Sequence, residues 1–220
     1  MRTIAVIARK GGSGKTTVAV HLALAGYLSR RHVLLADADP QKSALEVLKP
    51  RGADGPKVSE TTGRKLFALQ VEARRADVDL MVIDTAAGLE ESLSHAIVLA
   101  DLSILVVRPT FLDIAAAVQS LQVIRRLRRP AMVLLSQAPA SRDGIEAPAV
   151  KRTLQALELM RVPVMPPIVR ARAVYQTAME MGRSVQETAP GSAAAREMGA
   201  LWAFVENAVF GRRQAWAEAN

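Results

Sequence analysis

The sequence contains no cysteine. Disulfides, thiolate zinc sites and cysteine nucleophiles are therefore excluded. It also lacks any apolar run of the roughly 18 residues that a membrane-spanning helix needs. A strand-like pattern begins at residue 3, which leaves no room for a signal peptide before it. Together these absences predict a cytoplasmic protein.

Acidic residues are too few to balance the basic ones. The 220 residues include 29 lysines and arginines against 21 aspartates and glutamates, which gives a net charge of +8. Such a chain is drawn to polyanions by non-specific electrostatic attraction. Arginine makes up 22 of the 29 basic residues, which suits phosphate contacts but is equally explained by genomic base composition. The length predicts one α/β domain, residues 1–210, followed by a short tail, residues 211–220.

A glycine-rich stretch stands between a predicted strand and a predicted helix. Residues 3–8 are almost wholly apolar, as in a buried parallel strand, and residues 18–28 are rich in Ala and Leu. Glycines let backbone N–H groups converge on an anion, and the helix N-terminus adds partial positive charge. This order predicts a phosphate loop in which Lys15 reaches the terminal phosphates and the Thr16 hydroxyl ligates Mg²⁺. The predicted nucleotide-binding residues of the loop are Lys10, Gly11, Gly12, Ser13, Gly14, Lys15, Thr16 and Thr17.

Carboxylates follow two further predicted strands. Residues 33–36 lead into Asp37 and Asp39, and residues 78–83 lead into Asp84. The carboxyl ends of parallel strands form the crevice in which α/β sheets bind ligands. We therefore expect these acids to lie beside the phosphate loop, with Asp84 holding Mg²⁺ through water. An alternative for Asp39 is that it only caps the helix that follows.

The rest of the chain alternates helical and strand-like patterns. Residues 49–63 contain three glycines and two prolines and are predicted to form a loop. The alternation predicts an α/β P-loop NTPase with a mostly parallel central sheet flanked by helices on both faces. The further predicted helices are residues 64–76, 92–100, 114–127, 148–160 and 193–210. The further strands are residues 102–107 and 131–136, and residues 162–169 are predicted to form a final short strand and its exit loop.

The phosphate loop departs from the usual G-x-x-x-x-G-K-[ST] pattern. Arg9 stands where the first glycine belongs, and an additional lysine, Lys10, follows it. With Asp-Ala-Asp-Pro-Gln at 37–41 and Val-Ile-Asp-Thr at 82–85, this variant resembles the ParA/MinD family of ATPases, which have a deviant Walker A motif. The resemblance covers nearly all of residues 1–207 and is closest to small ParA partition ATPases without an N-terminal helix-turn-helix.

The resemblance implies catalytic roles for Lys10, Lys15 and Asp39. Lys10 would cross a dimer interface and touch the nucleotide of the other subunit; the alternative is an ordinary solvated loop charge. Asp39 would orient or activate the attacking water, and Asp37 would support the Mg²⁺ shell. The implied metal-site residues are Thr16, Asp37 and Asp84.

Later segments resemble the family less specifically. Gly88 would sense the γ-phosphate through its N–H, and Pro109 would lie near the nucleotide. Asp113 fits either a position at the dimer face or a helix cap. Basic DNA contacts are implied at Arg170, Arg172 and Arg183, with scattered surface charge as the alternative.

The implied function is that of a slow ATP hydrolase with ATP and Mg²⁺ as cofactors. The absence of an Asn-Lys-x-Asp guanine motif favours ATP over GTP. ATP-driven homodimerisation and non-specific DNA binding would partition or position a plasmid, a chromosome or another cargo, and a ParB-like or adaptor protein would stimulate hydrolysis. The ATP-bound form would then be associated with the nucleoid.

Three alternatives stay open. One is a MinD-like ATPase that acts at a membrane surface, although residues 214–220 are neither basic nor strongly apolar and so do not resemble a membrane anchor. Another is a metabolic ATP-dependent ligase or synthetase on the same fold. The third is a nucleotide-binding scaffold that scarcely hydrolyses.

Overall fold

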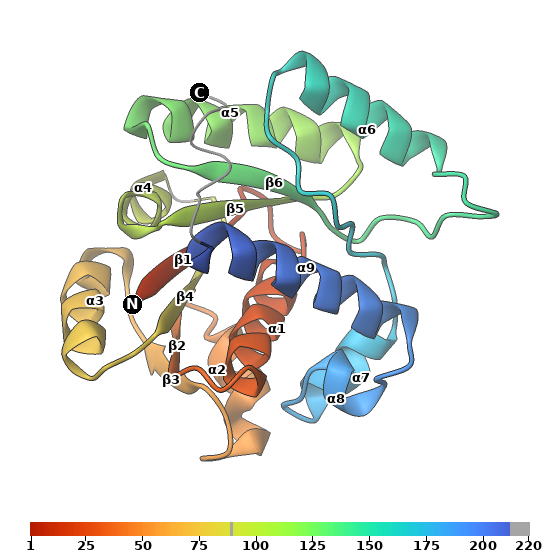
Figure 1. The fold of residues 1–220 in the computed structure, drawn as a ribbon. Helices are drawn as coiled ribbons and strands as arrows, with labels where there is room; N and C mark the ends of the chain where they lie inside the picture. Colours follow the sequence, from red (N-terminus) through yellow and green to blue (C-terminus); the bar gives the residue numbers. More distant parts are fainter. Residues whose placement is uncertain (89, 212–220) are drawn as a thin grey trace.

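A six-stranded parallel sheet forms the centre of the protein (Figure 1). The computed structural model describes residues 1–88 and 90–211. The strand order is β3-β2-β4-β1-β5-β6, and every neighbouring pair is parallel, which confirms the predicted fold class. The strands are β1 (Arg2–Ile7), β2 (Val33–Ala38), β3 (Lys57–Glu60), β4 (Leu80–Thr85), β5 (Leu102–Val107) and β6 (Ala131–Leu135).

Helices cover both faces of the sheet (Figure 1). On one face lie α1 (Lys15–Leu28), α2 (Ser43–Leu48), α7 (Val174–Glu180), α8 (Val185–Thr188) and α9 (Ala193–Phe210). On the other lie α3 (Leu66–Arg75), α4 (Glu90–Leu99), α5 (Phe111–Leu127) and α6 (Pro148–Leu159). Successive strand residues point to opposite faces, so Ile4 and Val6 pack with the first group and Ala5 and Ile7 with the second. Two 3₁₀ turns, η1 (Lys49–Arg51) and η2 (Gly63–Lys65), complete the helical elements of the described residues.

Helix α1 passes unusually close to the sheet. A Cβ atom on Gly26 would lie 2.9 Å from Leu80 Cδ2 and 3.1 Å from Val33 Cγ2. A glycine at this position therefore allows helix and strands to approach more closely than an alanine would. Because α1 follows β1 after a short loop, its N-terminus and the phosphate loop lie at the carboxyl edge of the sheet.

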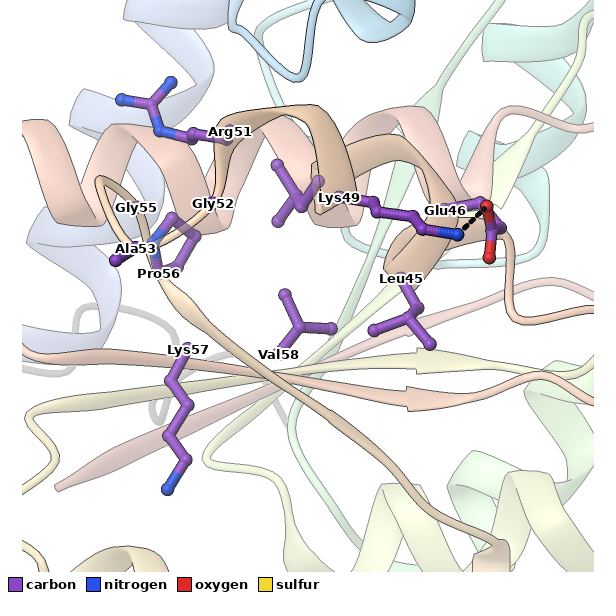
Figure 2. A pocket seen from close by; sticks show the side chains of 11 residues that line it. Leu45, Glu46, Lys49, Arg51, Gly52, Ala53, Gly55, Pro56, Lys57 and Val58 are labelled. Atoms are coloured by element: carbon purple, nitrogen blue, oxygen red, sulfur yellow. Dashed lines mark ion pairs between the residues drawn. The ribbon is translucent and has the colours of Figure 1, made fainter.

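The prediction that residues 49–63 form a loop is wrong. The segment contains η1 and the edge strand β3, which pairs with β2 from Leu34–Lys57 to Asp37–Glu60. Three of its glycines and prolines, Gly52, Gly55 and Pro56, lie in the turn between these two elements. Between α2, η1 and β3 lies a cavity of about 590 Å³ (Figure 2), into which Leu45 and Val58 project, whereas Lys57 points away from the helix.

The short strand predicted within residues 162–169, before its exit loop, does not form a strand in the structure. The structure has only isolated bridges there, Val133 with Val164 and Ala138 with Arg170. Three prolines in this segment, at 163, 166 and 167, have no N–H to donate to a ladder. The segment therefore accompanies β6 without becoming a seventh strand.

The predicted boundary at residue 210 coincides with the last residue of α9. Residues 212–220 of the predicted tail lie outside the described residues. Within the described part of the chain, no helix combines the length and apolarity needed to cross a membrane.

Candidate functional site

The phosphate loop connects β1 to α1 and depends on two glycines with positive φ. Gly12 has φ 69° and Gly14, which precedes α1, has φ 95°. A Cβ atom on Gly14 would lie 2.7 Å from Ser136 Oγ, so both the backbone angle and the available space require glycine. The Gln137 side chain donates a hydrogen bond from Nε2 to the carbonyl oxygen of Gly12, at 2.8 Å. The loop is thus fixed from the side of β6, which the sequence had not indicated.

Lys15 is buried although it carries a charge. Only 6% of the residue is exposed, and the described residues provide no ion pair within 4 Å. A buried ammonium group without a counter-ion is costly. At the end of a glycine-rich loop, that unbalanced charge suits the phosphates of a nucleotide.

Thr16 and Asp84 lie together at the same edge of the sheet. The Thr16 hydroxyl donates to Asp84 Oδ2 at 2.7 Å, while Asp84 Oδ1 is buried and has no hydrogen-bond partner among the described residues. Burial raises the pKa of Asp84 to about 7, although the Thr16 hydrogen bond and the charge of Lys15 oppose the rise. Asp84 Oδ1 is therefore available as a ligand, and a cation beside Asp84 would stabilise the charged carboxylate against its burial. Both features fit Mg²⁺, which prefers oxygen ligands.

Asp37 faces Asp84 across neighbouring strands, because the two are register partners of β2 and β4. Its Oδ1 accepts from the N–H of Asp39 at 3.1 Å and its Oδ2 from the N–H of Leu45 at 3.0 Å. Burial raises the pKa of Asp37 and these backbone hydrogen bonds lower it, with a net rise. No group of three His, Cys, Asp or Glu side chains in the described ranges could hold a metal alone. A cation here would take its remaining ligands from the nucleotide and from water.

The structure assigns the helix cap to a different aspartate from the one considered in the sequence. Asp37, not Asp39, bonds a first-turn amide of α2, that of Leu45. Asp39 Oδ1 accepts only from the N–H of Gln41, at 3.0 Å, in a local turn. The Asp39 carboxylate thus lies at the edge of the site and is not used to cap α2. Its predicted catalytic role stays a prediction.

Gly88 and Pro109 lie on the loops that follow β4 and β5, the two strands that pair with β1. Gly88 has φ 86°, and a Cβ atom there would lie 3.7 Å from the carbonyl oxygen of Arg9. Pro109 is buried two residues after the end of β5, the strand that pairs with β1. The fold therefore brings both predicted residues to the edge of the sheet where the phosphate loop lies.

Asp113 is enclosed by cations and a helix cap. Thr110 is the N-cap of α5 and accepts from the N–H of Asp113 at 3.2 Å. Arg108 binds the Asp113 carboxylate through Nε and a terminal nitrogen, at 3.0 and 3.2 Å. Burial alone would raise the pKa of Asp113, but hydrogen bonds from Arg108 and Thr110, with the charges of Arg108 and Lys10, hold it below its usual value. Lys10 is half-buried beside this group.

Two of the three arginines expected to contact DNA are bound within the chain. Arg170 pairs with Glu146, with nitrogen–oxygen distances of 2.5 and 2.7 Å, and Arg172 pairs with Glu197 at 2.6 Å. Arg183 is exposed. The ion pairs neutralise Arg170 and Arg172, so their predicted role at DNA stays a prediction that the geometry does not favour.

A cavity of about 410 Å³ adjoins the phosphate loop. Gly14 and Thr17 form one wall, and the segments after β6 and before α7 form the others. Its position beside Lys15 and its size suit a nucleoside attached to the bound phosphates. The larger cavity of Figure 2 contains none of the predicted site residues. The residues of the nucleoside wall are Ser136, Gln137, Val169, Arg170, Ala171, Arg172, Ala173, Tyr175 and Gln176.

Comparison with known proteins agrees with this geometry. Residues 4–185 match the model of the CobQ/CobB/MinD/ParA nucleotide binding domain. The chain is 31% identical over 211 residues to the maintenance of carboxysome distribution protein A of Halothiobacillus neapolitanus, covering 89% of this chain and 92% of that protein. Two solved structures share the fold. One is an ATP complex of a variant of McdA from Cyanothece, with a TM-score of 0.72 and 15% identity, covering 93% of this chain and 96% of that one. The other is MinD with Mg-ADP from Pyrococcus horikoshii, with a TM-score of 0.72 and 21% identity, covering 93% of this chain and 96% of that one.

Proposed function

The chain belongs to the CobQ/CobB/MinD/ParA nucleotide-binding family, and on that premise we propose that it is a Mg²⁺-dependent ATPase that positions a large cargo. In this proposal ATP closes two copies into a dimer, the dimer binds DNA without sequence preference, and hydrolysis releases it. A partner protein accelerates the hydrolysis. The chain is then associated with the nucleoid while ATP is bound.

One observation carries the ATPase assignment. Lys15 is buried without an ion pair, and the Thr16–Asp84 hydrogen bond of 2.7 Å leaves Asp84 Oδ1 without a partner. The first group requires an anion and the second a cation, and a nucleotide with its metal supplies both. Thr16 and Asp84 would hold Mg²⁺, which when bound would neutralise phosphate charge. Phosphoryl transfer needs mainly positioning and such neutralisation, and in this proposal Asp39 orients the water that attacks the γ-phosphate.

Lys10 is the residue that makes dimerisation part of the mechanism. It stands at the start of the loop, next to Gly11 and half-buried near Asp113, while Lys15 already serves its own phosphate site. A second lysine on the same loop is available to a neighbouring molecule. If each copy contributes Lys10 to the other's nucleotide, ATP holds the dimer together and its hydrolysis releases the two copies.

The identity of the cargo has less support than the ATPase reaction. A relative that matches most of the chain maintains carboxysome distribution, and this supports the positioning of a large assembly. It supports partition of a plasmid or chromosome less directly. The net charge of +8 supports an anionic track, such as DNA, for either cargo.

A mixing experiment tests the exchange of Lys10 between subunits. The variants Lys10→Ala and Asp39→Ala are each expected to hydrolyse ATP poorly. In a mixed dimer, the protomer with Lys10→Ala keeps its own Asp39 and receives Lys10 from its partner, so one site is complete. Mixing the two variants is therefore expected to restore up to about half of the wild-type rate per mixed dimer.

Light scattering provides the companion measurement. Asp39→Ala with ATP and Mg²⁺ is expected to run at twice the mass of the chain, and Lys15→Gln, which cannot hold the nucleotide, is the matched monomer control. A monomeric Asp39→Ala that binds ATP, or a mixture with no restored hydrolysis, contradicts the dimer mechanism. A wild-type chain that does not bind ATP would contradict the ATPase assignment itself.

A further inference from the structure

DNA binding as proposed above requires positive charge that is not already neutralised within the chain. Arg170 and Arg172 do not provide it, because Glu146 and Glu197 hold them at 2.5 and 2.6 Å. Of the three arginines expected to contact DNA, only Arg183 is exposed, and one cation does not hold a duplex, so further contacts are needed elsewhere. The inference that follows rests on the proposed function and locates its DNA surface.

Four arginines gather where α5 and α6 end. Arg125 is in the last turn of α5, Arg128 and Arg129 follow that helix, and Arg161 follows α6. We call these four residues the arginine cluster. They surround a cavity of about 360 Å³, and none of the described residues that line it is acidic. Its apolar floor is formed by Leu121, Ile124, Ala131, Val162 and Pro163.

Backbone carbonyls hold two members of the cluster in place. A terminal nitrogen of Arg125 donates to the carbonyl oxygen of Met160 at 2.6 Å, and one of Arg129 donates to that of Ala100 at 3.0 Å. A carbonyl fixes a guanidinium without cancelling its charge. Since guanidinium has five N–H donors, most donors of both groups remain available. Both residues are exposed, so these donors can reach an external ligand.

The other two members stand where the backbone leaves a helix. Arg128 has φ 50° and Arg161 has φ 52°, the left-handed conformation that ends a helix. Both are exposed. Cations at helix ends are also favoured by the helix dipole, which explains one or two of them. The helix dipole does not explain why four arginines from the ends of two different helices surround one cavity.

The cluster lies far from the nucleotide and from the expected dimer face. It precedes β6, whereas the phosphate loop follows β1, and the two strands run parallel through β5. Strands of five or six residues separate the two edges of the sheet by about 17–20 Å. Figure 1 shows α5 and α6 beside β6 on one face of the sheet. A dimer that closes over the phosphate loops therefore leaves both clusters uncovered.

We propose that the arginine cluster is the surface by which this chain binds the phosphate backbone of duplex DNA. Guanidinium groups bind phosphate oxygens through two parallel N–H bonds, and a duplex offers phosphates at regular spacing without regard to sequence. An acidic protein segment would satisfy the charges as well. The net charge of +8 over the whole chain favours the longer polyanion.

The test compares two double variants that remove the same charge. Arg128→Asn with Arg161→Asn changes the cluster, and asparagine tolerates the left-handed backbone of both positions. Arg74→Gln with Arg75→Gln, on exposed positions of α3, is the control. Each pair removes two positive charges from the net +8. Binding to a random-sequence duplex is measured by fluorescence anisotropy with ATP and Mg²⁺ at a series of salt concentrations.

The cluster variant is expected to bind the duplex at least tenfold more weakly at about 100 mM salt. Each lost phosphate contact reduces the slope of log affinity against log salt by about 0.9, so two contacts reduce it by about 1.8 for each cluster that touches DNA. The control pair is expected to keep the wild-type slope. ATP-dependent dimerisation should be unchanged in both.

Different failures of this experiment have different meanings. If the wild type binds DNA and the cluster variant keeps its slope and affinity, the location proposed here is wrong and the proposed function stands. If the cluster variant loses binding to polyglutamate but not to DNA, the cluster serves an acidic protein and the proposal is also overturned. A wild-type chain that dimerises with ATP yet does not bind DNA contradicts the DNA step of the proposed function as well.

Discussion

His21 offers a measurable link between the phosphate loop and the opposite end of the chain. It lies on α1 one turn after Thr17, with its Nδ1 2.8 Å from the Thr17 carbonyl oxygen, and its Nε2 accepts from the N–H of Val185 at 3.3 Å. Since Nε2 accepts, the network assigns the proton to Nδ1. The ring also meets the edge of Tyr175, with ring centroids 5.4 Å apart. The neutral imidazole therefore joins α1 to α7 and α8.

Burial lowers the pKa of His21 from 6.5 to about 4, more than the Thr17 hydrogen bond and the charge of Glu187 raise it. Between these two values the unfolded chain binds a proton that the folded protein does not. The contribution of His21 to stability is thus complete above pH 6.5 and is lost as the pH falls toward 4. The loss amounts to about 2 kcal/mol at pH 5 and roughly 3 kcal/mol at pH 4.

The variant His21→Gln isolates this effect, because glutamine does not titrate and its amide can still bond Thr17 and Val185. Urea unfolding of both proteins at pH 7.5, 6.5 and 5 gives the difference in free energy of unfolding, in which other titrating groups cancel. The variant is expected to gain about 2 kcal/mol relative to the wild type between pH 7.5 and pH 5. A difference that stays constant within about 0.5 kcal/mol would refute the neutral, buried imidazole.

Three further predictions concern the site and its surroundings. Lys15→Gln is expected to abolish ATP binding in calorimetry while the circular dichroism spectrum is kept; unchanged affinity would contradict the phosphate-loop assignment. Burial raises the pKa of Asp84 to about 7, so the nucleotide-free protein loses stability as the pH rises from 4 to 7. Asp84→Asn should thus be more stable than the wild type at pH 8, by on the order of 2 kcal/mol, but lack Mg²⁺-dependent hydrolysis, and a less stable variant would count against this. Arg51→Leu breaks a largely buried pair with Glu187 at 2.8 Å and should cost about 2–4 kcal/mol in urea unfolding, whereas Arg64→Leu, in an exposed pair, should cost less than about 1 kcal/mol; equal costs would show that burial of the pair is not decisive.

The sequence was sufficient to predict those parts of the site whose residues lie close together along the chain. The glycines of the loop and the position of Lys15 could be predicted because one strand–loop–helix unit, β1 to α1, contains them. The places of Asp37 and Asp84 could be predicted because each comes at the end of a buried parallel strand. The parallel fold followed from the alternation of elements, and the structure confirms it.

Long-range contacts account for what the sequence did not reveal. Strand β3 is stabilised by pairing with β2 at the sheet edge, and its four residues have no distinctive pattern of their own. The partners of Arg170 and Arg172 are 24 and 25 residues away in sequence. Glu146 and Glu197 carried no signal that would have assigned them to these arginines. Folding also gave the capping of α2 to Asp37 and not to Asp39, because the strand end brings Asp37 to the first turn of that helix.

The place of β1 in the sheet has a consequence for local opening. β1 lies between β4 and β5, and its residues from Ile4 to Ile7 are entirely inaccessible to solvent. Backbone amides in such a strand exchange with deuterium only when nearly the whole molecule unfolds, whereas those of a short edge strand exchange through local fraying. We expect β3 and η1 to exchange orders of magnitude faster than β1. The phosphate loop therefore follows the strand that unfolds last. Local unfolding of the edge strand β3 can leave the geometry of this loop undisturbed.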